Sequence, residues 1–263
     1  MISPGFPGDI PRDFHRDIPR SRRPVVAGPL VLAHRGARRR APENTLEAFA
    51  VARDLGADGV ELDVRRTRDG VLVLHHDPAP PDGPVLAAID HAEVRERFPS
   101  IPTLPEALDV CAGLLVNVEI KNLPWEGDFD AAESVADAVV DLVAARGGRD
   151  QVLVSSFHLP TVDRVHERDP ALPTAFLFIA GMDVVDVVDL SADHGHVAVH
   201  PEMRALGGPD AHEFVAHAHE RGLAVNVWTV NEPSDMARLA DLGVDALVTD
   251  VPDVALRTLG RTP

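Results

Sequence analysis

The chain has 263 residues, of which 45% are hydrophobic and 25% are charged, a balance typical of a globular protein. Its formal net charge of −17 argues against nucleic acid or an anionic membrane surface as a partner, because both repel an acidic protein. The single cysteine, Cys111, excludes an internal disulfide and indicates a reducing compartment. A chain of this length fits one large domain.

The N-terminal residues 1–27 are rich in Pro and Arg, so we expect them to form a flexible tail ahead of a folded domain at residues 28–260. The tail has no apolar run of signal-peptide length, and no stretch of 18 consecutive apolar residues occurs in the chain. We therefore expect a cytoplasmic protein without stable membrane insertion.

From residue 30 onward, short apolar runs that are typical of strands alternate with Ala-rich segments of helical periodicity. Strands are expected at 30–33, 59–64, 114–120, 152–155, 174–178, 197–200, 224–228 and 246–249, and helices at 43–55, 131–145, 211–221 and 233–242. This alternation predicts an α/β protein with a (β/α)8 TIM barrel. A doubly wound open sheet is the alternative, but no G-x-G-x-x-G motif follows any of these strands.

One further strand-like run, residues 71–75, interrupts this alternation. It follows the second barrel strand across Asp69-Gly70, which is a strong hairpin signal, whereas a parallel neighbour would need a longer crossover. We expect a hairpin outside the barrel, and a turn centred between Asp69 and Gly70 would place His76 opposite Asp63. The Pro-rich residues 78–103 would then be a short insertion after the second strand.

Polar residues stand at the carboxyl ends of the first three predicted strands, where the active sites of such barrels lie. They are His34 and Arg35, then Glu61 and Asp63, then Glu119 and Lys121, which share one face of their strand with Asn117. Strand alternation places Glu61 and Asp63 on one face of their strand. Burying three carboxylates is costly without a compensating cation, and oxygen ligands select Mg²⁺ or Ca²⁺. We therefore expect Glu61, Asp63 and Glu119 to hold one divalent cation, although pairing with nearby arginines would also explain them.

The remaining charged residues suit catalysis on an anion. His34 and His76 titrate near neutrality and suit general acid–base roles, although a lone histidine at a strand end is often structural. Arg35 and Lys121, the one lysine among 25 basic residues, suit the binding of a phosphate. With a divalent cation present, the predicted site would carry a charge of about +1 and attract a phosphate monoanion.

A set of short motifs occurs in order along the chain. They are His34-Arg35-Gly36, Pro42-Glu43-Asn44-Thr45, Glu61-Leu62-Asp63-Val64, Thr67-Arg68-Asp69-Gly70, His76-Asp77, Glu119-Ile120-Lys121 and Val227-Trp228-Thr229-Val230-Asn231. The ordered set resembles the glycerophosphodiester phosphodiesterase family over roughly residues 30–258. Each motif alone is weak, but the order and spacing together are highly specific.

The resemblance implies a barrel enzyme that uses a divalent metal to hydrolyse glycerophosphodiesters, small-molecule substrates, to sn-glycerol 3-phosphate and an alcohol. It makes His34 and His76 the acid–base pair. It makes Glu61, Asp63 and Glu119 the metal ligands, with Arg35 and Lys121 contacting the phosphate. The implied mechanism has the glycerol 2-hydroxyl attack phosphorus and water open the resulting cyclic phosphate.

Two alternatives to this function stay open. One is a lysophospholipase D-like phosphodiesterase on the same barrel, which would need an apolar mouth, and the other is a non-catalytic barrel that binds phosphodiesters. Two residues are possible walls of the pocket: Glu43, which a helix dipole would also explain, and Trp228, which packing would also explain. His194-Gly195-His196 resembles an H-x-H metal motif but precedes its strand, at the end of the barrel away from the predicted active site.

Overall fold

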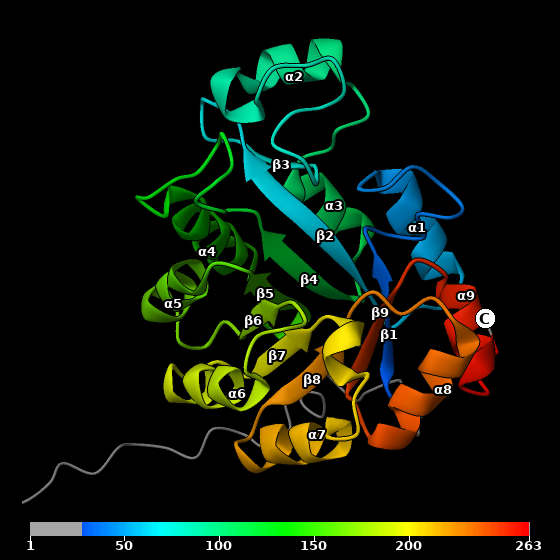
Figure 1. Ribbon diagram of the computed structural model, residues 1–263. Coiled ribbons are helices and arrows are strands. Elements are labelled where there is room, and N and C mark those ends of the chain that lie inside the picture. The colour runs from blue at the N-terminus through cyan, green and yellow to red at the C-terminus, as the bar shows by residue number, and fades with distance from the viewer. Residues whose placement is uncertain (1–27, 263) are drawn as a thin grey trace, which may run out of the picture.

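The computed structural model describes residues 28–262, so the predicted tail at residues 1–27 lies outside the described residues. Parallel strands form a barrel that closes because β1 pairs with both β2 and β9 (Figure 1). The barrel strands are β1 (Leu30–His34), β2 (Gly59–Arg66), β4 (Leu115–Ile120), β5 (Val152–Ser156), β6 (Thr174–Phe178), β7 (Ala198–Pro201), β8 (Ala224–Val227) and β9 (Ala246–Thr249). The prediction of a (β/α)8 barrel is confirmed.

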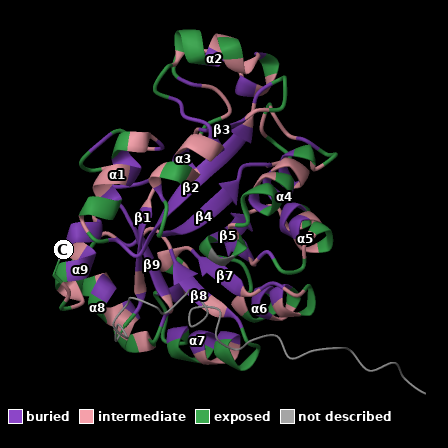
Figure 2. Cartoon of the chain, turned by 180° about the vertical axis from the view of Figure 1, so that it is seen from behind, coloured by how far each residue is buried: buried purple, intermediate pink, exposed green. Residues whose placement is uncertain are grey.

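Helices follow the barrel strands and cover the outside of the barrel. They are α1 (Leu46–Asp54), α3 (Leu104–Val110), α4 (Ser134–Arg146), α5 (Leu159–Arg168), α6 (Val184–Asp193), α7 (Ala211–Glu220), α8 (Pro233–Leu242) and α9 (Pro252–Thr258). Figure 2 shows buried strands surrounded by helices that expose one face. Across residues 28–262, no helix combines the length and apolar character needed to cross a lipid bilayer.

The core is divided between the outside and the inside of the barrel. Two large apolar clusters fill the space between strands and helices, one from β1 to α5 and the other around β6 to α9. Inside the barrel, a small cluster that includes Leu32, Leu115 and Val248 closes the interior. Inside the barrel, this apolar packing leaves the carboxyl ends of the strands as the place where polar side chains meet.

Helix α1 begins at Leu46, three residues later than the sequence pattern predicted. Asn44 has a left-handed backbone with φ of +54°, and the Thr45 hydroxyl accepts a hydrogen bond from the Ala48 N–H at 3.2 Å, so Thr45 is the N-cap. Glu43 therefore lies in the loop before the helix and not in its first turn, so the helix dipole, the alternative explanation for this residue, does not apply. The helix predicted at 131–145 also begins later, at Ser134.

The hairpin after the second strand exists, but its register differs from the prediction by one residue. Strand β3 (Leu72–Leu74) pairs antiparallel with β2, and Val64 lies opposite Leu74. The Thr67 N–H bonds to the Val71 carbonyl at 2.9 Å, and Gly70 has φ of +83°, which together define a three-residue turn with a left-handed glycine. Asp63 therefore lies opposite His75, whose N–H donates to the Asp63 carbonyl at 3.1 Å.

The predicted insertion between the hairpin and α3 carries a short helix of its own. Helix α2 (His91–Arg97) and the 3₁₀ turn at Leu86–Ala88 pack on the hairpin through a separate apolar cluster that includes Val73, Leu86 and Val94. This unit projects beyond the barrel at the top of Figure 1. It extends the barrel at the same end as the predicted site.

Candidate active site

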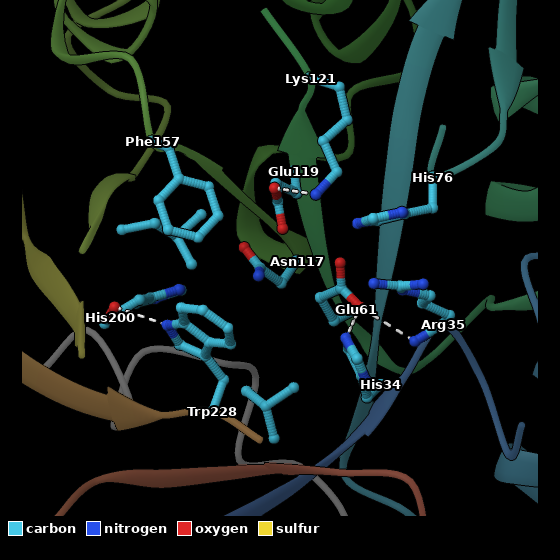
Figure 3. Close-up of a pocket in the computed structure, with 12 residues that line it drawn as sticks. His34, Arg35, Glu61, His76, Asn117, Glu119, Lys121, Phe157, His200 and Trp228 are labelled. Carbon is cyan, nitrogen blue, oxygen red and sulfur yellow. Dashed lines mark hydrogen bonds and ion pairs between the residues drawn. The ribbon is translucent and has the colours of Figure 1, made fainter. Parts of the chain in front are cut away.

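A pocket opens at the carboxyl ends of the barrel strands. Its lining residues are His34, Arg35, Glu61, His76, Asn117, Glu119, Lys121, Phe157, Leu177, His200, Trp228 and Val248. Charged residues occupy one side of the pocket, whereas Phe157 and Trp228 form an aromatic wall on the other, with ring centroids 5.4 Å apart (Figure 3). The structure thus brings the predicted site residues of the first three barrel strands together.

The three predicted carboxylates come from adjacent strands in matching register. Asp63 on β2 lies beside Glu119 on β4, and Glu61 precedes Asp63 by two residues on the same face of β2. One carboxylate oxygen from each residue lies within 4.8 Å of the others. Glu61 and Glu119 are 3% and 7% exposed, and Asp63 is fully buried, so the cluster sits at the floor of the pocket.

Two cations lie against this carboxylate cluster. Lys121 Nζ is 3.0 Å from Asp63 Oδ1 and also donates to Glu119, while Arg35 Nε is 3.1 Å from Asp63 Oδ2. Burial opposes ionisation of Asp63, but Lys121 and Arg35 outweigh it and hold the pKa of that carboxyl well below its usual range. Arg35 therefore does pair with the cluster, whereas Arg65 pairs with Glu126 and Asp128 instead.

The two side-chain cations do not fully compensate the three carboxylates. Burial, followed by the charges of Asp63 and Glu119, raises the pKa of Glu61 well above its usual value. Glu61 Oε1 is also buried without a hydrogen-bond partner, and Asp63 Oδ1 is buried with only the ion pair to Lys121 described above. A divalent cation would satisfy these oxygens and supply the missing positive charge. Glu61, Asp63 and Glu119 therefore fit a metal ion.

His34 is oriented by a residue that the sequence analysis missed. Its Nδ1 donates to Asp250 Oδ1 at 2.7 Å, and the other oxygen of Asp250 accepts from Asn231 Nδ2 at 2.9 Å. Burial opposes ionisation of Asp250, but the bond from His34 and the charge of Arg38 keep its pKa below the usual value. His34 Nε2 is thereby left to face the pocket, 4.0 Å from Glu61 Oε2.

His76 reaches the pocket although it does not lie opposite Asp63. The buried Arg65 donates from Nε to the His76 carbonyl at 2.9 Å, which anchors the chain after β3. The His76 Nδ1 pairs with Asp77 Oδ1 at 2.8 Å, leaving Nε2 directed toward the pocket (Figure 3). Burial, together with the nearby Lys121, lowers the pKa of His76, so its neutral form prevails at pH 7.

Asn44 is a further site residue, which belongs to the second sequence motif but had no predicted role. Its Nδ2 donates to Asp63 Oδ2 at 2.8 Å, and its Oδ1 accepts from the Asp63 N–H at 3.2 Å, so it fixes the orientation of this carboxylate. Its partner in the motif, Glu43, does not line the pocket but accepts from Arg35 at 2.8 Å. Trp228 does line the pocket, and its Nε1 donates to the His200 carbonyl at 2.8 Å.

A tight turn after β1 orients the residues of the motif His34-Arg35-Gly36. Gly36 has φ of +79°, and a Cβ there would lie 2.7 Å from the backbone of Ala48, so only glycine allows α1 to pack this closely. The Arg35 N–H in the same turn donates to Glu61 Oε2 at 2.9 Å. The loop after β1 thus fixes the position of a carboxylate on β2.

A (β/α)8 barrel whose strand ends hold a carboxylate cluster, two oriented histidines and two cations is the framework of a hydrolase acting on an anionic ester. The family model described as "Glycerophosphoryl diester phosphodiesterase family" matches residues 34–254. The chain belongs to this family of enzymes.

Individual relatives agree with the family assignment. The chain is 30% identical to a glycerophosphodiester phosphodiesterase of Caldanaerobacter subterraneus subsp. tengcongensis over 88% of this chain and 98% of that protein. It is 29% identical to one of Bacillus altitudinis over 86% of this chain and 96% of that protein. The crystal structure of a glycerophosphodiester phosphodiesterase from Thermotoga maritima superposes with a TM-score of 0.75 at 27% identity, covering 87% of this chain and 97% of that one.

Proposed function

We propose that this enzyme hydrolyses glycerophosphodiesters to sn-glycerol 3-phosphate and an alcohol. The observation that carries the proposal is the placement of three carboxylate oxygens within 4.8 Å of one another, in a pocket that also presents His34 and His76. Family membership supports the same substrate class. In this proposal Glu61, Asp63 and Glu119 hold one divalent cation, Mg²⁺ or Ca²⁺, as their hard oxygen ligands favour.

The two histidines would act as the acid–base pair. In the first step, the glycerol 2-hydroxyl attacks phosphorus, one histidine accepts the hydroxyl proton, and the bond from phosphorus to the alcohol oxygen breaks as the other histidine donates a proton. The second step uses water and reverses the two roles, which opens the cyclic phosphate. The Nδ1 bonds to Asp250 and Asp77 support these roles because they leave both Nε2 atoms free for proton transfer.

Lys121 and Arg35 would bind the phosphate. Lys121 Nζ lies between Asp63 and Glu119, so it can reach an oxygen on phosphorus from the side of the carboxylate cluster. Arg35 offers a planar fork that suits a second phosphate oxygen. A divalent cation, when bound, supplies Lewis-acid stabilisation of the charge that develops on phosphorus.

Steady-state kinetics on glycerophosphocholine test this proposal. The protein is first treated with a chelator, and Mg²⁺ or Ca²⁺ is then added back in separate reactions. We expect release of glycerol 3-phosphate only after a cation is restored. Full turnover in protein shown by elemental analysis to be metal-free would remove the role of the three carboxylates.

Exposed apolar side chains in two loops that follow barrel strands favour a second candidate, a lysophospholipase D-like activity. Trp125 follows β4 and is 78% exposed, while Ile179 and Met182 follow β6 and are 53% and 44% exposed. Both loops lie at the carboxyl ends of their strands, as the pocket does, and could contact the acyl chain of a lysophospholipid. A higher kcat/KM for lysophosphatidylcholine than for glycerophosphocholine, lowered by Trp125→Ala, would favour this candidate.

A further inference from the structure

A second cluster of possible metal ligands lies at the opposite end of the barrel from the pocket. It consists of Asp163 on α5, His194 at the end of α6, and His196 just before β7. The other end of β7 carries His200, which lines the active-site pocket, so the strand separates the two sites. None of the three residues contributes to the proposed hydrolysis. The sequence motif H-x-H did not indicate which residue would lie beside its two histidines.

The three side chains converge on one point. Asp163 Oδ1 is 2.8 Å from His194 Nδ1 and 3.2 Å from His196 Nε2, and the ligand atoms all lie within 4.8 Å of one another. Tetrahedral ligands held about 2.0–2.1 Å from a zinc ion are themselves about 3.3 Å apart. The cluster can therefore surround such an ion with small side-chain movements.

His196 is held in the way expected of a metal-binding histidine. Its side chain is fully buried, and its Nε2 lies 3.2 Å from Asp163 Oδ1 without forming a well-aligned hydrogen bond. Its Nδ1 pairs with the Thr174 hydroxyl at 2.9 Å, which turns Nε2 toward Asp163. Metal-binding histidines are commonly held through their second ring nitrogen in this way.

The surroundings suit entry of an ion and its capture. The side chains of His194 and Asp163 are 36% and 26% exposed, so the site opens to solvent on one side. Gly195, with φ of +81°, makes the turn that brings both histidines to the same place.

We propose that Asp163, His194 and His196 form a second metal site, which takes Zn²⁺ or a similar imidazole-binding divalent ion. Two imidazoles and one carboxylate are typical ligands of zinc, whereas the all-carboxylate cluster in the pocket suits hard cations. Solvent would occupy the fourth position. The ion would tie α5 to the segment between α6 and β7, far from the reacting atoms, so the site is structural.

Zinc titration of the full chain tests the proposal. Binding is measured by competition with a zinc-chelating dye in a large excess of Mg²⁺, which occupies the carboxylate cluster of the pocket. We expect one tight site in the unmodified chain. His194→Ala and the isosteric Asp163→Asn should each weaken zinc binding by at least about 10-fold, since each removes a ligand or its charge. Circular dichroism checks that both variants are folded.

Two control variants separate zinc binding at this cluster from binding at a surface histidine or in the pocket. His219 is a matched control because it forms the same kind of pair as His194 without a second histidine beside it. Its Nε2 lies 2.9 Å from Asp245, and its side chain is 42% exposed. His219→Ala should leave zinc affinity unchanged, and so should Asp63→Asn in the pocket. Absence of micromolar zinc binding would overturn the proposal. Unchanged affinity in folded His194→Ala and Asp163→Asn, or loss of the tight site in Asp63→Asn, would also overturn it.

Discussion

Asp250→Asn should remove most of the activity while leaving the fold intact, because it inverts the tautomer of His34. Asn231 Oδ1 accepts from the Asp250 N–H at 2.9 Å and from Thr249 Oγ1 at 3.2 Å, so its amide cannot turn around. Asn231 Nδ2 must then face the amide oxygen of the new side chain at position 250. The amide nitrogen of that side chain must therefore face His34 Nδ1. Nδ1 becomes an acceptor, the proton moves to Nε2, and Nε2 can no longer accept a proton from the substrate.

The size of the effect follows from the burial of the pair. A hydrogen bond to a charged group contributes about 1.5–3 kcal/mol, equivalent to about 10- to 100-fold in rate. Asp250 is only 9% exposed, so water does not replace that bond, and the wrong tautomer adds to the loss. We expect kcat to fall by at least about 100-fold, with a smaller change in KM because no substrate contact is removed.

Steady-state kinetics on glycerophosphocholine measure this loss, and ¹⁵N NMR of the His34 ring reports the tautomer directly. Asp77→Asn is the matched control, because Asp77 pairs at 2.8 Å with His76, the other histidine proposed for catalysis, but is 70% exposed. Solvent screens that pair, so kcat should fall by less than about 10-fold. Near-normal kcat in a folded Asp250→Asn variant, or equal losses in the two variants, would show that Asp250 does not set the tautomer of His34.

Other predictions address catalysis, phosphate binding, metal and stability. His34→Ala and His76→Ala should each lower kcat by about 10²–10⁴-fold, and the double variant should be little worse than either; a single variant with normal kcat would assign that histidine a structural role. Lys121→Arg should lower kcat/KM at least about 10-fold, since a wide guanidinium would compete with the divalent cation. Lys121→Met should lower it further. Normal kinetics in Lys121→Arg would mean that only the positive charge matters at this position. Asp63→Asn should weaken Mg²⁺ or Ca²⁺ binding in calorimetry, and unchanged affinity would exclude it as a ligand. His196 has a folded pKa of about 4, below its ordinary value of about 6.5, so the unfolded chain takes up a proton that the folded chain does not. In zinc-free buffer, this proton uptake lowers the free energy of unfolding by about 2 kcal/mol from pH 7 to pH 5. Urea unfolding at the two pH values should show a smaller decrease in this free energy for His196→Gln than for the unmodified chain.

The barrel and the centre of the site were predictable because both depend on local patterns. Alternating apolar strands and amphipathic helices specify a parallel barrel. Parallel register then brings residues at the ends of neighbouring strands together, as it does for Asp63 and Glu119. The convergence of His34, Glu61 and Lys121 in one pocket follows from the same rule.

The features that were missed depend on geometry that local patterns do not specify. The Asp69-Gly70 signal fits both a two-residue and a three-residue turn, and the left-handed φ of Gly70 selects the latter. Asp250 is 216 residues from His34, and only closure of the barrel between β9 and β1 makes them neighbours. Its position directly after the last barrel strand was a usable signal, because active-site residues collect at strand ends.

The second cluster shows the same limit. The H-x-H motif placed His194 and His196 correctly before a strand, but it carried no information about which residue on a neighbouring helix would meet them. Packing of α5 beside that segment supplies Asp163. Side-chain convergence between elements far apart in the sequence is therefore the part that required the structure.

Product analysis shows directly whether the enzyme cleaves the bond between phosphorus and the alcohol oxygen of a glycerophosphodiester. Glycerophosphocholine is incubated with the full chain and Mg²⁺ or Ca²⁺, and ³¹P NMR follows the phosphorus-containing product, with a Glu61→Gln variant alongside. We expect sn-glycerol 3-phosphate from the unmodified enzyme and almost none from Glu61→Gln. Formation of phosphocholine, or equal sn-glycerol 3-phosphate release by the variant, would exclude the proposed hydrolysis.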